Sequence, residues 1–228
     1  AQGGLFGNSP WIIIIYVVVI AALFYFMLYR PQKKKDKENE QEFERIYLQV
    51  NKFIHRKIFK KLYPIQPVEA DNKIYDTCCH LEWVEQKHVI ENPNLMLDNF
   101  LPAAIRNIKK VGLVKSPLHK IESFNDVIGL IKNTIMFSLN KSDLGMDDFV
   151  PVFLYAVIKA KPRTYASDLK YIELFLDGDL KSKQYGLILG VATMAKEALL
   201  NFDPNRLFGV SEEDFKKKFL FHLSLFLI

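Results

Sequence analysis

The sequence predicts an all-α protein that is preceded by one transmembrane helix. Over most of the chain, apolar residues recur at three- and four-residue spacing, which is the pattern of helices with one buried face. No segment shows the sustained alternation of apolar and polar residues that a half-buried strand requires. Near the N-terminus, residues 11–29 carry no charge, and a helix needs roughly 20 such residues to cross the hydrocarbon layer.

The apolar segment 11–29 is best explained as a membrane anchor. Trp11 and Tyr16 lie near one end of it, and Tyr25 and Tyr29 lie near the other, as interfacial aromatic residues do. A cleaved signal peptide would have basic residues before its apolar core, and none precede this one. A buried core helix is disfavoured because the segment is apolar on all sides.

The charges that flank this segment predict its orientation. Basic residues crowd its C-terminal side, namely Arg30, Lys33, Lys34, Lys35 and Lys37. The positive-inside rule then places residues 30–228 in the cytosol and leaves residues 1–10 as a short extracytosolic stub. The basic run 30–37 would also lie against anionic lipid headgroups. We interpret residues 30–42 as a charged linker.

The stretch FYFMLYRPQKKK, within residues 11–37, resembles the membrane anchor of the YajC family, an accessory of the bacterial secretion translocase. YajC proteins continue into a small β domain rich in glycine and valine, and nothing of that kind follows here. The resemblance implies a similar way of anchoring, or a fused segment.

Composition argues against several classes of function. The net charge of +5 is modest and much of it sits in the run 30–37, so a nucleic-acid partner is not expected. The only cysteines are Cys78 and Cys79, which fits a reducing compartment. Although His80 follows, three consecutive side chains splay apart, so ordinary packing is favoured over a zinc site. No metal or cofactor is expected.

Familiar catalytic motifs are also missing from the sequence. It contains no GxxxxGK[ST] phosphate loop, no GxGxxG, no HExxH and no GxSxG elbow. In an all-helical protein, this makes hydrolase or oxidoreductase chemistry improbable.

Three helices are predicted from Phe43 onward, and the first two lie in an N-terminal helical bundle at residues 43–91. The first runs from Phe43 to Tyr63, before Pro64, with apolar residues on one face. The second covers about residues 71–86. The third covers about residues 94–110, where Pro102 predicts a kink or a break.

Further helices are predicted from start signals and spacing. Ser116 and Pro117 form a cap followed by a first-turn proline. Later helices are expected at residues 151–161, 167–176 and 182–201. A C-terminal helix at 211–228 begins with Ser211 and Asp214 in a capping-box arrangement. Its apolar end is too short to span a bilayer and should pack back on the bundle.

An acidic pair stands out before the most apolar helix. Asp147 and Asp148 are followed by Pro151 and by a run of apolar residues, and we expect them in a loop just before the helix. Carboxylates near a helix N-terminus commonly cap its free N–H groups. Spacing alone therefore leaves a capping role and a functional role both open.

The strings MDDFVPVFLYAVIKAKP, YASDLKYIELF and QYGLILG resemble, in order and spacing, the core of the Vps-nine domain family. Ser116, Pro117 and Lys120 resemble that family's entry to the core. The resemblance covers residues 43–215 and implies a layered helical core at 92–210, supported by the bundle before it. It also implies a guanine-nucleotide exchange factor for endosomal Rab GTPases.

The resemblance assigns roles to individual residues. It makes Asp147 an acidic finger that enters the nucleotide site, where a carboxylate competes for the P-loop lysine and repels the phosphates of GDP. Tyr185 would touch the switch regions of the GTPase. The remaining GTPase-binding positions are Asp148, Phe149, Val150, Pro151 and Tyr155.

One departure from the family pattern keeps alternatives open. The family usually has threonine or serine shortly after the tyrosine, whereas this chain has Leu187 and Ile188. Gln184 also stands where the first of two tyrosines is expected. Weakened or re-targeted exchange, or a purely packing role for Tyr185, therefore remains open.

Two functions follow from these observations. The first is a single-pass membrane protein, with its domain in the cytosol at the endosomal membrane, that promotes GDP release from a Rab. The alternative is a membrane-anchored, non-catalytic interaction protein or translocase accessory. The first requires an exposed apolar groove beside Asp147, in which Phe149 and Val150 take part.

Overall fold

The structure is a computed structural model that describes residues 18, 20, 22, 23, 25, 30–64, 68–95 and 97–225. The described ranges contain helices, turns and loops but no strand, so the predicted all-α class is confirmed there. The chain divides into two compact units, Ala1–Asn51 and Lys52–Ile228.

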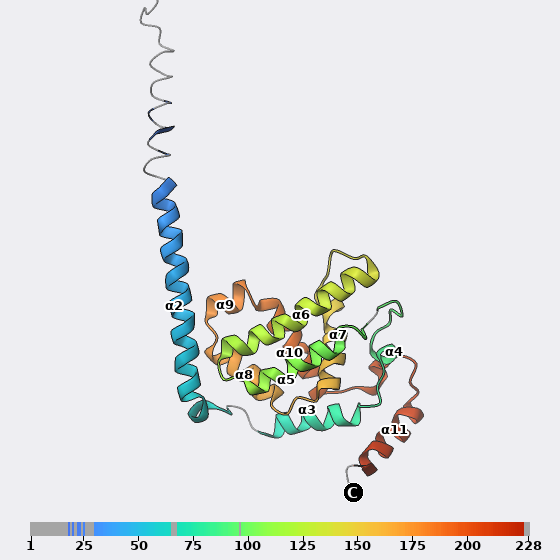
Figure 1. Cartoon of the computed structure of the whole chain (residues 1–228). Coiled ribbons are helices and arrows are strands. Elements are labelled where there is room, and N and C mark those ends of the chain that lie inside the picture. Colours follow the sequence, from blue (N-terminus) through green and yellow to red (C-terminus); the bar gives the residue numbers. More distant parts are fainter. Residues whose placement is uncertain are drawn as a thin grey trace, which may run out of the picture. The chain divides into compact units, whose positions relative to one another are not determined.

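Helix α2 (Arg30–Leu62) begins in the first unit and ends in the second (Figure 1). The charged stretch 30–42, which we had interpreted as a linker, is therefore helical. Lysine and glutamate are good helix formers.

The predicted membrane span 11–29 lies outside the described residues, apart from the five isolated positions given above. Among the residues that the structure does describe, no helix combines the length and the apolar character needed to cross a membrane. The anchor therefore stays a prediction from sequence.

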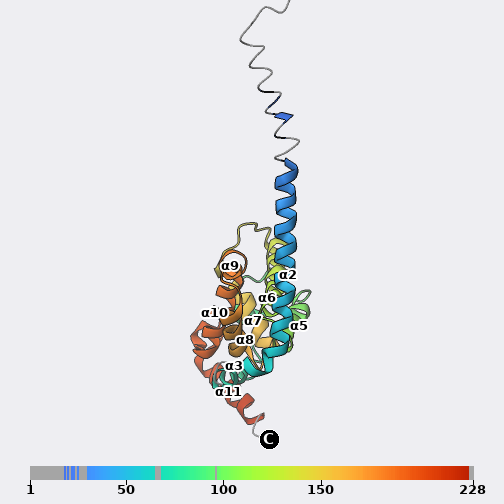
Figure 2. The ribbon, with the colours of Figure 1, turned by 90° about the vertical axis from the view of Figure 1, so that its left-hand side faces the viewer.

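The second unit holds the remaining helices. They are α3 (Val68–His80), α4 (Gln86–Val89), α5 (Leu101–Leu113), α6 (Pro117–Leu139), α7 (Met146–Ala160), α8 (Tyr165–Phe175), α9 (Gly178–Lys183), α10 (Gly186–Leu200), the short 3₁₀ helix η2 (Pro204–Arg206) and α11 (Glu212–Leu225). Helix α7 lies among α5, α6 and α10 and also contacts α3 (Figures 1 and 2).

The core forms around α7 because this helix is apolar on nearly all sides. Phe153, Ala156, Val157 and Ile158 are fully buried. Helix α6 faces it with the apolar stripe that the spacing predicted, and the ring of Phe124 on α6 lies 5.9 Å from that of Phe153. Burying side chains of this size contributes about 1.5–3 kcal/mol each.

Several helix boundaries differ from prediction for identifiable reasons. Pro102 is the second residue of α5, where proline disrupts no hydrogen bond, so the predicted kink does not occur. Pro151 lies one turn inside α7, which begins at Met146 rather than at residue 151. The helix predicted at 182–201 is split at Gln184 and Tyr185 into α9 and α10.

The C-terminal helix begins as predicted, and Phe215 and Phe219 pack against neighbouring residues. The Ser211 hydroxyl accepts a hydrogen bond from the Asp214 N–H at 3.1 Å and donates one to its carboxylate at 2.7 Å. Phe215 is buried, and the ring of Phe219 lies 4.6 Å from that of His80 on α3.

The two cysteines are free and buried. Across the described part of the chain, no group of three or more His, Cys, Asp or Glu side chains is placed to hold a metal ion.

Candidate functional site

The acidic pair lies in the first turn of α7, not in the loop that precedes it. Asp148 caps the helix, because its carboxylate accepts a hydrogen bond from the Gly145 N–H at 3.0 Å. The Lys141 ammonium donates to both oxygens of Asp148, at 2.7 and 2.8 Å. These bonds, from Lys141 first and then Gly145, hold the pKa of Asp148 below its usual value. The local capping role therefore belongs to Asp148.

Asp147 differs from its neighbour in its contacts. Its side chain is exposed, and within the described residues its carboxylate accepts no hydrogen bond and forms no ion pair. A carboxylate at a helix N-terminus is favoured by the helix dipole without any partner. The Asp147 carboxylate thus remains available to another molecule.

An apolar pocket of about 270 Å³ lies beside Asp147. Both aspartates, Pro151 and Val152 line it from α7, and Phe208 lines it from the loop before α11. The other lining residues are Val89, Ile90, Glu91, Asn92, Leu95, Ile135 and Leu139. Most of these side chains are apolar, so the acidic group stands at the edge of a surface that can bury apolar side chains of a partner.

Only some of the residues chosen from the sequence line this pocket. Phe149 is only 3 % exposed and belongs to the core, so the expectation that its side chain lines an exposed groove is wrong. The reason is helical geometry: Phe149 faces inward once α7 starts at Met146. Val150 is half-buried and does not line the pocket, whereas Pro151 does.

A second apolar surface meets the first turn of α7 from α10. Met146 packs against Gly190, so closely that a Cβ built there would lie 2.6 Å from its terminal methyl carbon. Leu187 and Met194, three residues before and four after Gly190, share its face of α10 and are 44 % and 45 % exposed. Sequence reasoning missed these positions, although a glycine inside an apolar helix is a signal of close approach.

The two tyrosines assigned to the GTPase surface are both buried. Tyr185 is 5 % exposed and caps α10, where its carbonyl accepts from the Leu189 N–H at 2.9 Å. Tyr155 is 7 % exposed. Burial raises the pKa of both phenols. The structure therefore brings Asp147, Asp148 and Pro151 to one pocket and leaves these rings within the core.

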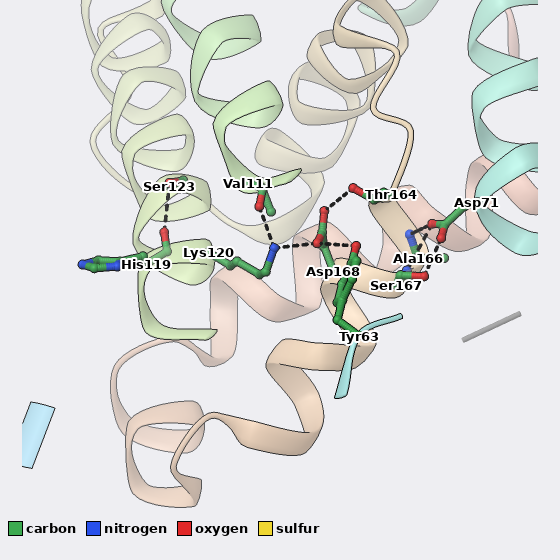
Figure 3. A network of polar contacts seen from close by, with 10 residues as sticks. All are labelled: Tyr63, Asp71, Val111, His119, Lys120, Ser123, Thr164, Ala166, Ser167 and Asp168. Carbon is green, nitrogen blue, oxygen red and sulfur yellow. Dashed lines mark hydrogen bonds and ion pairs between the residues drawn. The ribbon is translucent and has the colours of Figure 1, made fainter. Parts of the chain in front are cut away.

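A buried ion pair joins α6 to α8 (Figure 3). The Lys120 ammonium lies 2.7 Å from the Asp168 carboxylate and donates to the Val111 carbonyl at 2.8 Å. Asp168 also accepts from the hydroxyls of Tyr63 and Thr164, each at 2.8 Å. Burial raises the pKa of Asp168 and lowers that of Lys120, and their mutual attraction opposes both shifts.

A second buried carboxylate joins α3 to the start of α8 (Figure 3). Asp71 accepts from the N–H groups of Ala166 and Ser167, at 2.7 and 3.1 Å, and from the Ser167 hydroxyl. Since α8 begins at Tyr165, Asp71 acts as an N-terminal cap supplied from another helix. Together the two networks connect α3, α6 and α8 with Tyr63, the residue that follows the last residue of α2.

Comparison with known families identifies the region that carries this site. Residues 101–204 match the family model described as the vacuolar sorting protein 9 (VPS9) domain. The matched segment begins with α5 and ends at η2, so it contains α7 and α10. The comparisons give no support to the resemblance of residues 11–37 to the YajC family.

Relatives agree with this match. The chain is 23 % identical to vacuolar protein sorting-associated protein 9A of Oryza sativa subsp. japonica over 186 residues, which is 79 % of this chain and 38 % of that protein. It is 25 % identical to the Bos taurus GTPase-activating protein and VPS9 domain-containing protein 1 over 152 residues, 64 % of this chain and 11 % of that protein. It is 27 % identical to Homo sapiens alsin over 92 residues, 40 % of this chain and 6 % of that protein. The chain thus spans well under two thirds of these relatives, and a VPS9 domain at residues 101–204 is supported.

Proposed function

Starting from a VPS9 domain at residues 101–204, we propose that this chain is a guanine-nucleotide exchange factor for a small GTPase of the Rab family. The proposal rests on the Asp147 carboxylate, which is exposed and has no partner among the described residues. It lies at the N-terminus of α7, at the edge of an apolar pocket.

The chemistry of exchange explains why such a carboxylate is needed. A GTPase holds GDP largely through Mg²⁺ and a P-loop lysine, which neutralise the phosphates. A carboxylate that enters this site pairs with the lysine and repels the phosphates, so both the metal and the nucleotide lose partners. Asp147 can do this because no side chain among the described residues already neutralises it.

Affinity for the GTPase would come from the apolar surfaces on either side of Asp147. One is the pocket next to Pro151, and the other is the face of α10 that exposes Leu187 and Met194. Apolar contacts of this kind supply most of the binding energy in protein interfaces, whereas a charge at the centre adds specificity. Binding and nucleotide release are therefore separable by mutation.

We assign Tyr185 and Tyr155 a positioning role in this function. Tyr185 caps α10 and so sets where the exposed face of that helix begins. Tyr155 lies two turns along α7 from Asp147, within the packed core. Neither ring needs to touch the GTPase in order to affect exchange.

The preference for an endosomal Rab and the membrane anchor at residues 11–29 complete the proposal. The first rests on the resemblance of the core strings to the Vps-nine family, and the second on the uncharged apolar run and the basic residues after it. Rabs are lipid-anchored, so confinement of both proteins to one membrane raises their effective concentration.

Release of fluorescent GDP from a panel of purified Rabs, with and without this protein, tests the proposal. The protein should accelerate release from at least one Rab, and Asp147→Ala should abolish the acceleration while leaving most of the Rab affinity. Asp148→Ala is the matched control and should retain exchange per folded molecule. Exchange that survives Asp147→Ala contradicts the role given to Asp147, and Rab binding without exchange in the wild type indicates a non-catalytic binding module instead.

A further inference from the structure

A second, larger pocket lies at the other end of α7 and is rich in positive charge. Its volume is about 660 Å³, within the usual range for small-molecule sites. Four cationic side chains line it, and Glu82 is its only carboxylate among the described residues. The cations are Lys109, Lys159, Lys161 and Arg163.

The negative end of the α7 dipole accounts for only part of this charge. Cations near a helix C-terminus are favoured, which explains Lys159 in the last turn of α7. Lys109 comes from α5, and Arg163 lies beyond the end of α7, so neither belongs to that helix terminus. The convergence of cations from different elements on one cavity needs another explanation.

A neighbouring tyrosine positions the Arg163 side chain, and the Lys161 backbone takes an unusual conformation. The Arg163 guanidinium lies 4.3 Å from the centroid of the Tyr75 ring and donates a hydrogen bond to its hydroxyl at 3.0 Å. This contact fixes a group that has five N–H donors and a planar fork suited to phosphate. Lys161 ends α7 with φ of 49°, a left-handed conformation that glycine or asparagine usually takes at that position.

Glu82 already occupies part of the pocket as an internal anion. Its carboxylate lies 2.7 Å from the Lys161 ammonium, and its carbonyl accepts from Lys159 at 2.7 Å. Lys109, by contrast, is exposed and has no hydrogen bond or ion pair with any residue that the structure describes. An incoming anion could therefore form ion pairs with Lys109 and Arg163, and it would compete with the Glu82 carboxylate for the Lys161 ammonium.

We propose that this pocket binds a phosphate-bearing anion, either the headgroup of a phosphorylated lipid or a soluble phosphate ester. Leu113 at its rim is 80 % exposed, and an apolar side chain beside a cationic pocket suits a headgroup at a membrane surface. Asp147 and Lys161 lie at opposite ends of α7, about 20 Å apart at 1.5 Å per residue, so the cationic pocket is distinct from the pocket beside Asp147.

Calorimetric titration of the full chain in detergent with soluble inositol trisphosphate, at fixed ionic strength, tests the proposal. The wild type should bind saturably, and Lys109→Gln should weaken binding about tenfold through loss of one charge-assisted hydrogen bond. Lys110→Gln is the matched control, because Lys110 lines a different pocket and should leave the affinity unchanged. Glu82→Gln should tighten binding, since it removes the competing carboxylate.

A second arm distinguishes the two sources of phosphate. A short-chain phosphoinositide with the same headgroup should bind more tightly than the trisphosphate if the ligand is a lipid, and Leu113→Ser should remove that difference. If the wild type binds the trisphosphate and the phosphoinositide with equal affinity, the ligand is a soluble phosphate ester. Absence of saturable binding by the wild type, or equal affinities in Lys109→Gln and Lys110→Gln, overturns the proposal. Since Lys109 has no partner among the described residues, its replacement does not threaten the fold, and GDP release from a soluble Rab should stay unchanged.

Discussion

Asp147 and Asp148 are neighbours in the first turn of α7, yet only Asp148 is engaged by the protein. Its carboxylate is held by Lys141 and by the Gly145 N–H, while that of Asp147 is exposed and makes no contact of this kind with the described residues. Helix geometry separates the two, because adjacent residues point about 100° apart. The pair therefore divides into one group that holds the helix and one that is free to act.

This division predicts that the two substitutions affect the stability of the protein differently. Asp148→Ala should lower the free energy of unfolding by about 1 kcal/mol, the usual cost of losing an N-terminal cap. Asp147→Ala should leave it nearly unchanged. Urea denaturation followed by circular dichroism measures both. Equal losses of stability in the two variants would show that Asp147 also has a structural role.

Gly190 should be essential for the apolar surface between α7 and α10. A side chain there must displace Met146, whose terminal carbon would lie 2.6 Å from the new Cβ. We expect Gly190→Leu to keep the helical content and to lower both Rab affinity and stimulated GDP release by at least about tenfold, the effect of losing one well-buried contact. Binding and exchange assays provide the measurement.

Gly129→Leu is the control for this experiment. Gly129 is also helical, and a Cβ there would meet nothing within 4 Å. It should leave exchange intact and raise stability slightly, because leucine is a better helix former than glycine. Wild-type exchange in Gly190→Leu would remove α10 from the proposed interface.

The buried ion pair should be sensitive to loss of one partner. Lys120→Met leaves the Asp168 carboxylate buried without its cation, which typically costs about 3–5 kcal/mol. Tyr63→Phe removes one hydrogen bond to Asp168 and should cost only about 1 kcal/mol. Replacing both charges, as in Lys120→Met with Asp168→Leu, should recover part of the loss. A double variant less stable than Lys120→Met would contradict this account.

The stability of the protein should decrease in mild acid. Burial lowers the pKa of His55, whose Nδ1 lies 2.6 Å from the Tyr171 hydroxyl. The unfolded chain protonates His55 near pH 6.5, whereas the folded protein does so only at lower pH. The contribution of His55 to the free energy of unfolding is therefore complete above about pH 6.5 and is lost as the pH falls through the lower pKa of the folded state.

Unfolding free energies measured between about pH 7.5 and 5 test whether the protein loses stability as the pH falls. His55→Gln should reduce the pH dependence without abolishing it, because burial also lowers the pKa of His88 and His119. An unchanged slope in His55→Gln would assign the effect to the other two histidines.

Membrane attachment can be tested by deletion of residues 1–29. The full chain should stay with the membrane fraction after carbonate extraction, because the uncharged run 11–29 is long enough to span the bilayer. The deletion variant should be released and should retain GDP release in solution. Release of the full chain by carbonate would remove the anchor from the proposal.

Much of the local structure could be predicted from the sequence. The start of α6 after Ser116, its buried apolar face, and the Ser211 cap of α11 all depend on residues within one or two turns, although the Ser116 hydroxyl does not make the predicted capping hydrogen bond. The position of Asp147 at a helix N-terminus was also close to prediction. Local spacing and capping chemistry specify such features because they involve only neighbours along the chain.

What the sequence by itself determined is therefore the all-α class, most of the helices and the short acidic segment in which the free carboxylate lies. Tertiary structure alone decided that Lys141 pairs with Asp148, that Phe149 and Tyr185 face the core, and that Phe208 and Gly190 border the first turn of α7. These features depend on which surfaces of distant helices meet. Such packing is settled by the shape and burial of side chains far apart in sequence, which no local pattern records.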